Sequence, residues 1–437
     1  MVQRPRGTRD FGPDEMGRRV AFERLCDEVG TKFGFTRVST PTFERLELFT
    51  AKSGQGIIDQ LYAFKDRSER DLTLRPELTA PVMRMVAEKG GQISKPARWS
   101  YFGPCFRYEE SKAGRYREFW QYGCEIIGAS GTLVEAEVIA FACSLLDACG
   151  LTGWVLRIGH VGILRDALAA LGLSEDVTSD VMRILDKGDI AALAGKGVPD
   201  EACEKLAALA ALDGGVETIP AARDILASMG AQTDSLAQLE SMLSSLAAMT
   251  PGIDGAASPQ IDLTVARGLD YYTGVVFEVE VDELGGEGQV LGGGSYNLLH
   301  LFGLEDLDPC CGFGLGFDRV LSALEIQAER ENRDEVVPGE SAGGSLAVIP
   351  FNIDTDAVLP LVAALRAAGV AVVVELRTRN LGRSMSWANN AGAAFALVIG
   401  PRDIESGQTM VKRLSDGEQA ECALDAEAIA GAVASLR

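Results

Sequence analysis

The sequence predicts an α+β chain with more than one domain, and three observations support this fold class. Around residue 120, polar and apolar side chains alternate at the two-residue period of a half-buried strand. From about 172 to 250 the chain is rich in Ala, Leu and Asp without a clear strand, which predicts a helical insertion. Beyond residue 345 strands and helices alternate, which predicts a small α/β domain with a mainly parallel core. A length of 437 residues is enough for two or three domains.

The remaining elements follow from local patterns in chain order. Helical periodicity predicts helices over residues 14–30, 80–88, 131–149, 160–172 and 381–391. Strands or hairpins are expected near residues 35–38, 65–80, 107–128 and 154–158, with a strand running into a helix over 312–328. Residues 292–294 are expected to form a glycine turn, and the Glu, Pro, Gly and Ser content of 329–344 predicts a linker. The expected boundaries are therefore a domain over 1–328, a linker over 329–344 and a second domain over 345–437.

Composition indicates a globular protein of a reducing compartment. The chain is 47% hydrophobic and 24% charged, which is ordinary for such proteins. It shows no apolar run of transmembrane length and no signal peptide, so we expect a cytoplasmic protein without a membrane partner. The nine cysteines form no CxxC pair and are expected to be buried thiols. With only two histidines, no metal site is expected.

The net charge of −22 is unusual for a protein that binds nucleic acid, because phosphate contacts normally come from Lys and Arg. A local basic groove remains compatible with an acidic total, and binding would then depend on a few placed Arg residues. Arg also outnumbers Lys about threefold. An acidic, Lys-poor surface suits a salt-rich cytoplasm, but the bias of a GC-rich genome gives the same composition, and both explanations stay open.

The most informative segment is 107–128, which predicts two short strands joined by a polar, basic loop. On the second strand, Phe119, Gln121, Gly123 and Glu125 share one face, and the other face is apolar. This face offers an aromatic ring and a gap at the glycine, and its amide and carboxylate are costly to bury unless something hydrogen-bonds them. Together with Arg107, this face suits a nucleotide. The rest of the face suits a second bound molecule that has both a cationic and an anionic group. The simpler alternative is a sheet edge with a solvated, charged face.

Two further motifs make that alternative less favourable. The first is TLRPELTAP over residues 73–81, and the second is LTVARGLDYYTGVVFEV over residues 263–279. This set, in this order, resembles the class II aminoacyl-tRNA synthetases, and ARGLDYYTGVVFE resembles the histidyl-tRNA synthetase family in particular. The resemblance covers nearly the full length, because GTRDF at residues 7–11 is similar to the opening of that family.

The resemblance implies a fold and partners. It implies an α+β catalytic domain of the class II synthetase type, with an antiparallel sheet flanked by helices and the helical insertion, followed by an α/β anticodon-binding domain. The segment over residues 33–44 resembles the motif that builds the dimer interface, so a homodimer is expected. The implied partners are L-histidine, ATP with Mg²⁺, and tRNA(His), and no prosthetic group is implied.

Activation of an amino acid joins a carboxylate to the α-phosphate of ATP, so the site must neutralise charge on phosphate oxygens. Arg suits this task because it stays charged and presents a planar fork. By resemblance, Arg107 bridges the carboxylate and the α-phosphate, Arg267 lies against the α-phosphate, and Arg319 holds ATP phosphates. Arg319 also lies in the first turn of a predicted helix, where a cation is unfavourable unless an anion binds.

The resemblance assigns the other site residues. Glu77 and Thr79 hold the α-amino group with backbone from Leu78, Glu125 accepts a hydrogen bond from the imidazole, and Phe119 stacks on adenine. The implied histidine-binding set is Glu77, Leu78, Thr79, Arg107, Gln121, Glu125, Arg267, Tyr271, Tyr272 and Tyr296. The implied ATP-binding set is Arg107, Glu109, Arg115, Phe119 and Arg319.

The sequence departs from the pattern of the family at one place, and two alternative functions have to be considered. The turn GGGSYNLL keeps Tyr296 but carries Ser295 and Asn297 where bacterial relatives usually have charged residues; this resembles archaeal variants. One alternative is a catalytically inactive paralogue that regulates ATP phosphoribosyltransferase in histidine biosynthesis. The other is a class II synthetase for Gly, Pro or Thr. The three candidate Arg residues and the C-terminal domain disfavour the first, and ARGLDYYTG with Glu125 disfavours the second.

Overall fold

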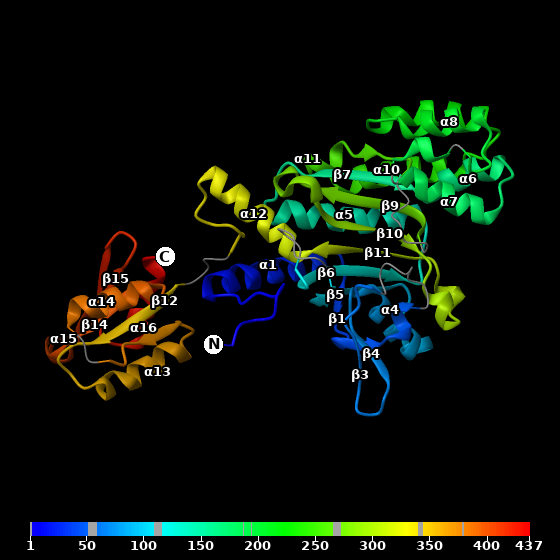
Figure 1. Cartoon of the computed structure of the whole chain (residues 1–437). Coiled ribbons are helices and arrows are strands. Elements are labelled where there is room, and N and C mark those ends of the chain that lie inside the picture. The colour runs from blue at the N-terminus through cyan, green and yellow to red at the C-terminus, as the bar shows by residue number, and fades with distance from the viewer. Residues whose placement is uncertain are drawn as a thin grey trace. The chain divides into compact units, whose positions relative to one another are not determined.

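The computed structural model describes residues 2–50, 59–108, 116–186, 188–193, 195–264, 272–339, 344–377 and 380–437 (Figure 1). Its internal contacts divide the chain into two compact units, Met1–Glu340 and Ser341–Arg437. Each unit has its own sheet and core, and the two are described separately below.

The first unit is built on an eight-stranded sheet in the order β1-β5-β6-β11-β10-β9-β7-β8. Its strands are β1 (Thr36–Val38), β5 (Ala97–Phe106), β6 (Glu118–Ile127), β7 (Val155–His160), β8 (Gln260–Ile261), β9 (Tyr272–Glu280), β10 (Gln289–Tyr296) and β11 (Cys310–Gly316). Neighbours are antiparallel except at the two edges, where β1 pairs with β5 and β8 pairs with β7 in parallel. The expected antiparallel sheet is therefore confirmed, with one parallel strand added at each edge.

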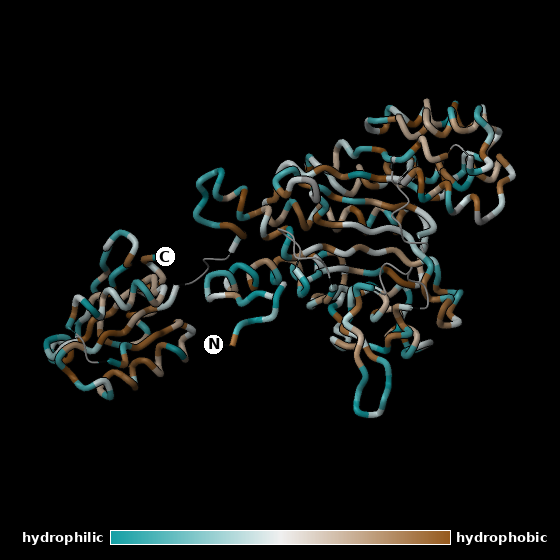
Figure 2. The backbone as a smooth tube through the Cα atoms, in the orientation of Figure 1, coloured by the Kyte–Doolittle hydropathy of each residue, from teal (hydrophilic) through white to brown (hydrophobic). Residues whose placement is uncertain are grey.

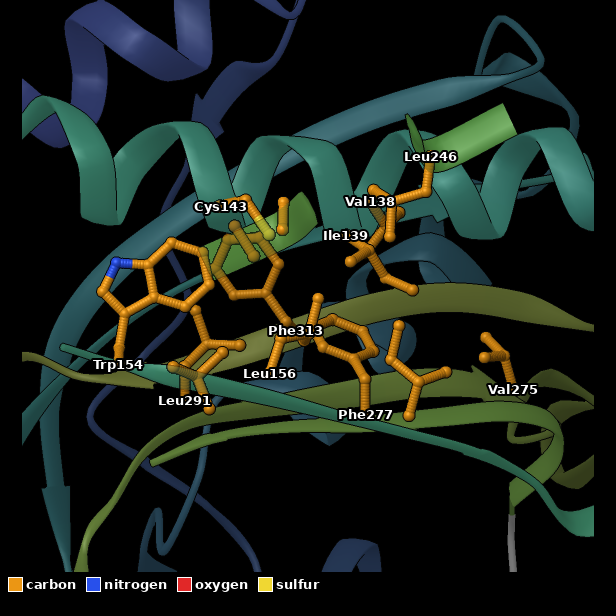
Figure 3. Packing of buried hydrophobic residues seen from close by; sticks show 14 of the residues in the cluster. Val138, Ile139, Cys143, Trp154, Leu156, Leu246, Val275, Phe277, Leu291 and Phe313 are labelled. Carbon is orange, nitrogen blue, oxygen red and sulfur yellow. The ribbon is translucent and has the colours of Figure 1, made fainter. Parts of the chain in front are cut away.

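Helices cover one face of this sheet and bury its main core. They are α1 (Pro13–Lys32), α5 (Thr132–Ala148) and α12 (Phe317–Glu331). Figure 3 shows Ile139 and Cys143 of α5 above Leu156, Phe277 and Phe313 of three different strands. Helix α5 is apolar nearly all round, as expected of a helix buried on two sides, because α10 (Asp234–Met249) packs on it as well. Full burial of each large apolar side chain contributes about 1.5–3 kcal/mol.

The opposite face carries a second core and the site. Helix α4 (Thr79–Lys89) packs Val82, Met83 and Val86 against this face. Beside α4 lies a small sheet of β2 (Phe43–Arg45), β4 (Asp71–Leu74) and β3 (Ala63–Lys65). The turn between β3 and β4 is hydrophilic (Figure 2).

The insertion is helical, as predicted. It contains α7 (Glu175–Asp186), α8 (Asp200–Ala210), α9 (Ile219–Ser228) and α10, preceded by α6 (Val161–Ala170). Their leucines, such as Leu206, Leu226 and Leu239, join the main core, so the insertion is packed onto the catalytic sheet through α5 and α6.

Three expectations about local structure were wrong. Residues 292–294 form the middle of strand β10 and not a turn. Both of its neighbours, β9 and β11, pair along this stretch, and the glycines permit a close approach of the backbones. The first strand of the predicted 107–128 hairpin ends at Phe106, so Arg107 follows it, and β5 and β6 are ten residues each. Within the expected linker, α12 continues to Glu331, and Val336 and Val337 are buried in the main core.

The second unit is a five-stranded sheet in the order β13-β12-β14-β15-β16. The strands are β12 (Ser345–Pro350), β13 (Val372–Val374), β14 (Ala393–Ile399), β15 (Gln408–Arg413) and β16 (Gln419–Ala423), and the helices are α13 (Leu359–Ala367), α14 (Leu381–Asn390), α15 (Pro401–Ser406) and α16 (Ala426–Ser435). Strands β13, β12 and β14 are parallel, as predicted, and β15 and β16 add an antiparallel hairpin at the other edge. In the part of the chain that the structure describes, no helix is long and apolar enough to cross a membrane.

Candidate active site

The centre of the site is a buried carboxylate that two tyrosines hold. Glu125 of β6 is 1% exposed. The hydroxyl of Tyr101 on β5 donates to its Oε1 at 2.7 Å, and the hydroxyl of Tyr296 on β10 donates to its Oε2 at 2.5 Å. Because three separate strands supply these side chains, the register of the sheet fixes the position of the carboxylate.

Two glycines make room for this group. A Cβ atom at Gly123 would lie 2.5 Å from the ring of Tyr101, and one at Gly312 would lie 1.8 Å from Oε2 of Glu125. The predicted gap at Gly123 is therefore filled by the ring of Tyr101. Strand β11 has a glycine at every second position, and at Gly312 this leaves room for the carboxylate of Glu125.

Burial dominates the electrostatics of Glu125. It raises the pKa of this carboxyl to about 7, while the hydrogen bonds from Tyr296 and Tyr101 oppose the rise. The pKa values of both tyrosines are raised well above their usual range by burial and by the charge of Glu125. Both hydroxyls therefore stay protonated and act as donors, and the carboxylate is the acceptor of the pocket.

Glu77 and Thr79 lie at the start of α4, beside this group. The carboxylate of Glu77 accepts hydrogen bonds from the backbone N–H groups of Thr79 at 2.5 Å and Ala80 at 2.9 Å. Each oxygen keeps a further lone pair for a ligand. The hydroxyl of Thr79 lies 3.3 Å from that of Tyr101, which links this helix to Glu125. The side chain of Leu78 is buried in the core, so only its backbone can face a ligand.

Arg107 lies between the two parts of the site. Its Nε donates to the carbonyl of Pro76 at 3.0 Å, and its guanidinium carbon lies 5.3 Å from the centre of the Phe119 ring. Burial raises the pKa of Glu77, and the charge of Arg107 opposes that rise. Arg107 is therefore close to the expected histidine side and to the expected adenine side at once.

The other predicted residues that the structure describes lie on strands of the same sheet or in the first turn of the helix that follows β11. Gln121 accepts a hydrogen bond from the thiol of Cys105 at 3.2 Å and pairs in register with Gly316, one residue before α12. Arg319 is half-buried in the first turn of α12, as predicted. Tyr272 is buried at the start of β9, and its carbonyl accepts from Arg165. Four predicted residues lie outside the described part of the chain: Glu109, Arg115, Arg267 and Tyr271.

Sequence reasoning missed two residues of the site, Tyr101 and Asp318. Tyr101 belongs to a strand that was expected to begin only at residue 107. The alternation of Tyr101, Gly103 and Cys105 on one face of β5 would have revealed it. Asp318 is buried beside Arg319, and its partners lie far away in the sequence.

The arrangement combines a fixed acceptor, a second carboxylate at a helix start, and cationic and aromatic groups at the ends of antiparallel strands. This fold and this site define a class II aminoacyl-tRNA synthetase. The family described as "Histidyl-tRNA synthetase" matches residues 7–320, and the "Anticodon binding domain" matches residues 345–432.

Similar proteins agree with these matches. A histidine–tRNA ligase of Archaeoglobus fulgidus is 43% identical over 422 residues, which span 96% of each chain. The crystal structure of histidyl-tRNA synthetase from Nostoc has a TM-score of 0.82 at 22% identity, covers both chains fully and shows the same fold. A structure from Bacillus halodurans, titled as an ATP phosphoribosyltransferase regulatory subunit/histidyl-tRNA synthetase, has a TM-score of 0.75 at 25% identity and covers 92% of this chain and 98% of its own. The chain belongs to the histidyl-tRNA synthetase family, whose enzymes are histidine–tRNA ligases that use ATP as a substrate.

Proposed function

We propose that this protein activates L-histidine with ATP to form histidyl-adenylate and pyrophosphate, and then transfers histidine to tRNA(His). The observation that carries the proposal is the carboxylate of Glu125, which two tyrosine hydroxyls hold as a buried acceptor. An imidazole N–H can donate to such a group. A pocket of this kind rejects ligands that leave its polar groups unpaired, which disfavours activation of Gly, Pro or Thr.

In the proposed reaction the oxygen of the histidine carboxylate attacks the α-phosphate, and the bond to pyrophosphate breaks. Both reactants are anions, so catalysis depends on orientation and on cations placed where charge develops. Arg107 takes the position between carboxylate and α-phosphate. Arg319 contacts the phosphates of ATP, Phe119 stacks on adenine, and Arg267 lies against the α-phosphate. The roles of Arg267, Glu109 and Arg115 toward ATP, and of Tyr271 toward histidine, are proposed from the sequence alone.

The amino-acid side of the proposal uses the residues around α4. The α-amino group of histidine donates to Glu77, whose oxygens keep lone pairs, and to the hydroxyl of Thr79. Tyr272, Tyr296 and Gln121 are the other described residues proposed to contact histidine. Mg²⁺ is proposed to bind together with ATP, through the phosphates, as this ion usually does. The described residues contain no group of three His, Cys, Asp or Glu side chains that could hold a metal without ATP.

The second unit is proposed to bind the anticodon stem of the tRNA. A regulatory paralogue usually lacks such a module and its catalytic Arg residues, whereas this chain matches the anticodon-binding family over residues 345–432. We place the domain boundary at Glu340 and not at residue 328, because Val336 and Val337 belong to the catalytic core.

We further propose a cytoplasmic homodimer. All nine cysteines are free thiols, as in reducing compartments. Phe43 and Phe64 are 55% and 43% exposed and line a surface groove of about 540 Å³ on the small sheet. Phe43 belongs to the segment that resembles the dimerisation motif, so a second copy is the proposed occupant. A monomer in sedimentation velocity at micromolar concentration would remove this part of the proposal.

Two assays test the function. Pyrophosphate exchange into ATP is measured with each standard amino acid, and we expect exchange with histidine alone. Charging of tRNA(His) is then compared between the full chain and a chain ended at Glu340. The shorter chain is expected to keep exchange and to charge tRNA poorly. Equal exchange with Gly, Pro or Thr, or no exchange at all, would contradict the assignment, and unimpaired charging would contradict the role of the second unit.

A further inference from the structure

A buried aspartate connects distant parts of the chain directly behind the ATP side of the site. Asp318, the second residue of α12, is 6% exposed. Its Oδ1 accepts from Nη2 of Arg9 and from Nη1 of Arg19, both at 2.6 Å, and its Oδ2 accepts from the backbone N–H of Trp120 at 2.7 Å. One carboxylate therefore joins the N-terminal segment, α1, β6 and α12.

Aromatic rings enclose the two arginines. The guanidinium of Arg19 lies 4.1 Å from the ring centre of Phe11 and 4.6 Å from that of Trp120. The guanidinium of Arg9 lies 3.5 Å from the ring centre of Tyr116 and 5.0 Å from that of Phe11. Cation–π contacts contribute most where water is excluded, so these rings hold both charges in place.

The N-terminal segment also fixes the ends of the loop that joins β5 to β6. The carbonyl of Gly7 accepts from the backbone N–H of Arg117 at 2.8 Å, and the carbonyl of Arg117 accepts from the N–H of Arg107 at 3.0 Å. A Cβ atom at Gly7 would lie 2.7 Å from Cγ of Arg117. Gly7, Arg9 and Phe11, which we name the N-terminal brace, thus contact the chain next to Arg107 and, through Asp318, next to Arg319.

We propose that Asp318 is a positioning residue for ATP, and that the N-terminal brace holds it in place. The inference rests on the proposed function, in which Arg107, Phe119 and Arg319 bind ATP. Asp318 fixes the backbone at Trp120, between Phe119 and Gln121, and it immediately precedes Arg319. The carboxylate therefore sets the distance between the adenine-stacking ring on β6 and the phosphate-binding guanidinium on α12.

The chemistry favours positioning over stability alone. A buried ion pair contributes little net stability compared with apolar packing, whereas removing one partner leaves a buried charge unpaired. Two arginines and a backbone N–H satisfy this carboxylate, so its geometry is over-determined. Misplacement of a binding group by about 1 Å can cost about 100-fold in rate, which makes such a rigid support useful beside the reacting phosphate.

The first test compares Arg9→Gln, Arg9→Lys and the control Arg4→Gln. Arg4 forms only an exposed pair with Asp10 at 3.8 Å. For Arg9→Gln we expect the KM for ATP in pyrophosphate exchange to rise about tenfold, the size of one charge-assisted hydrogen bond. The KM for histidine should change less than about twofold, because its pocket has separate supports. Arg9→Lys should recover part of the loss, and Arg4→Gln should match the wild type.

The second test separates positioning from general loosening. The affinity for ATP alone is measured by calorimetry for Arg9→Gln, Arg319→Ala and the double variant. If Arg9 acts through Asp318 on Arg319, its loss should weaken ATP binding much less in the Arg319→Ala background. Calorimetry needs no turnover, so this cycle decides the inference even if the wild type exchanges no pyrophosphate.

Three results would overturn the inference. Equal weakening of ATP and histidine by Arg9→Gln would indicate a structural role, and so would fully additive losses in the cycle. No change in ATP affinity would mean that the brace does not support the site. If Arg9→Gln does not fold, Arg9→Lys replaces it in both tests, because Lys keeps a charge beside Asp318 but not the planar fork of Arg. The same three results then decide the inference.

Discussion

The two halves of the site are built in different ways. On the proposed histidine side, Glu125, Tyr101, Tyr296 and Thr79 form one chain of hydrogen bonds, and all lie on the sheet or at the start of α4. On the proposed ATP side, Arg107, Phe119 and Arg319 are half-buried. Behind them, Asp318 joins Arg9 of the N-terminal segment to the backbone N–H of Trp120.

The difference follows from what each half must bind. A small aromatic ligand that differs from its competitors by a few polar atoms needs a pocket whose hydrogen bonds are fixed in advance. A polyanion needs cations in the right places, and their orientation can be set by a second layer of residues. Substitutions in the two halves should therefore separate effects on histidine from effects on ATP.

Arg107→Ala should cause the largest loss of activity, and it should affect histidine and ATP together. Arg107 contacts Phe119 and influences the pKa of Glu77, so its loss should impair both ligands. Loss of a charge contact to the transition state is expected to slow adenylate formation by about 10²–10³. Single-turnover kinetics measures this rate. Arg98→Ala, which removes a partly exposed pair with Glu137 at the other end of β5, is the control. A rate within a few-fold of wild type would show that Arg107 is not catalytic.

Glu125→Gln should impair histidine binding and leave ATP binding nearly unchanged. The amide replaces one acceptor oxygen with an NH₂ group that faces a tyrosine donor, so the KM for histidine should rise about 10- to 100-fold. ATP affinity should stay near the wild-type value. Glu44→Gln is a matched control, because Glu44 of the small sheet is also buried but pairs with Arg84 of α4. A parallel loss of ATP affinity would mean that Glu125 is a structural residue.

Tyr296→Phe should have a smaller effect that depends on pH. Its hydroxyl opposes the rise in the pKa of Glu125, which is about 7 in the wild type. Loss of this donor should raise that pKa further. Because the ionised carboxylate is the acceptor, kcat/KM for histidine should increase as pH rises through the pKa, and the midpoint should move to higher pH in the variant.

At high pH the remaining loss in Tyr296→Phe should be about three- to tenfold, because Tyr101 still holds the ionised carboxylate of Glu125. Profiles of kcat/KM from pH 6 to 9 give both quantities. Free histidine titrates in both sets of measurements, so the difference between the two profiles reports on Glu125. Coincident midpoints would mean that Tyr296 does not influence this carboxylate.

The positions of residues on a strand face or in a helix turn could be predicted from the sequence, because they depend on local periodicity. Alternation along β6 placed Phe119, Gln121 and Glu125 on one face, and the structure has Tyr122, Cys124 and Ile126 in the opposite core. The first-turn position of Arg319 also follows from the helix pattern, and it is confirmed.

Residues whose role depends on distant partners could not be predicted in this way. Asp318 resembles an ordinary acidic residue in the first turn of a helix, but its partners lie 309, 299 and 198 positions away. The glycines at 292–294 favour a turn locally, and only pairing with two neighbouring strands makes them a strand. Val337 lies in a polar segment, and its burial against the catalytic core depends on tertiary packing.

The separation of the two halves is tested most directly by calorimetry of two variants with two ligands. Histidine and ATP are titrated separately into wild type, Glu125→Gln and Arg9→Gln. We expect Glu125→Gln to weaken histidine about 10- to 100-fold and ATP hardly at all, and Arg9→Gln to weaken ATP about tenfold and histidine hardly at all. If either variant weakens both ligands to the same extent, the two halves are not built independently.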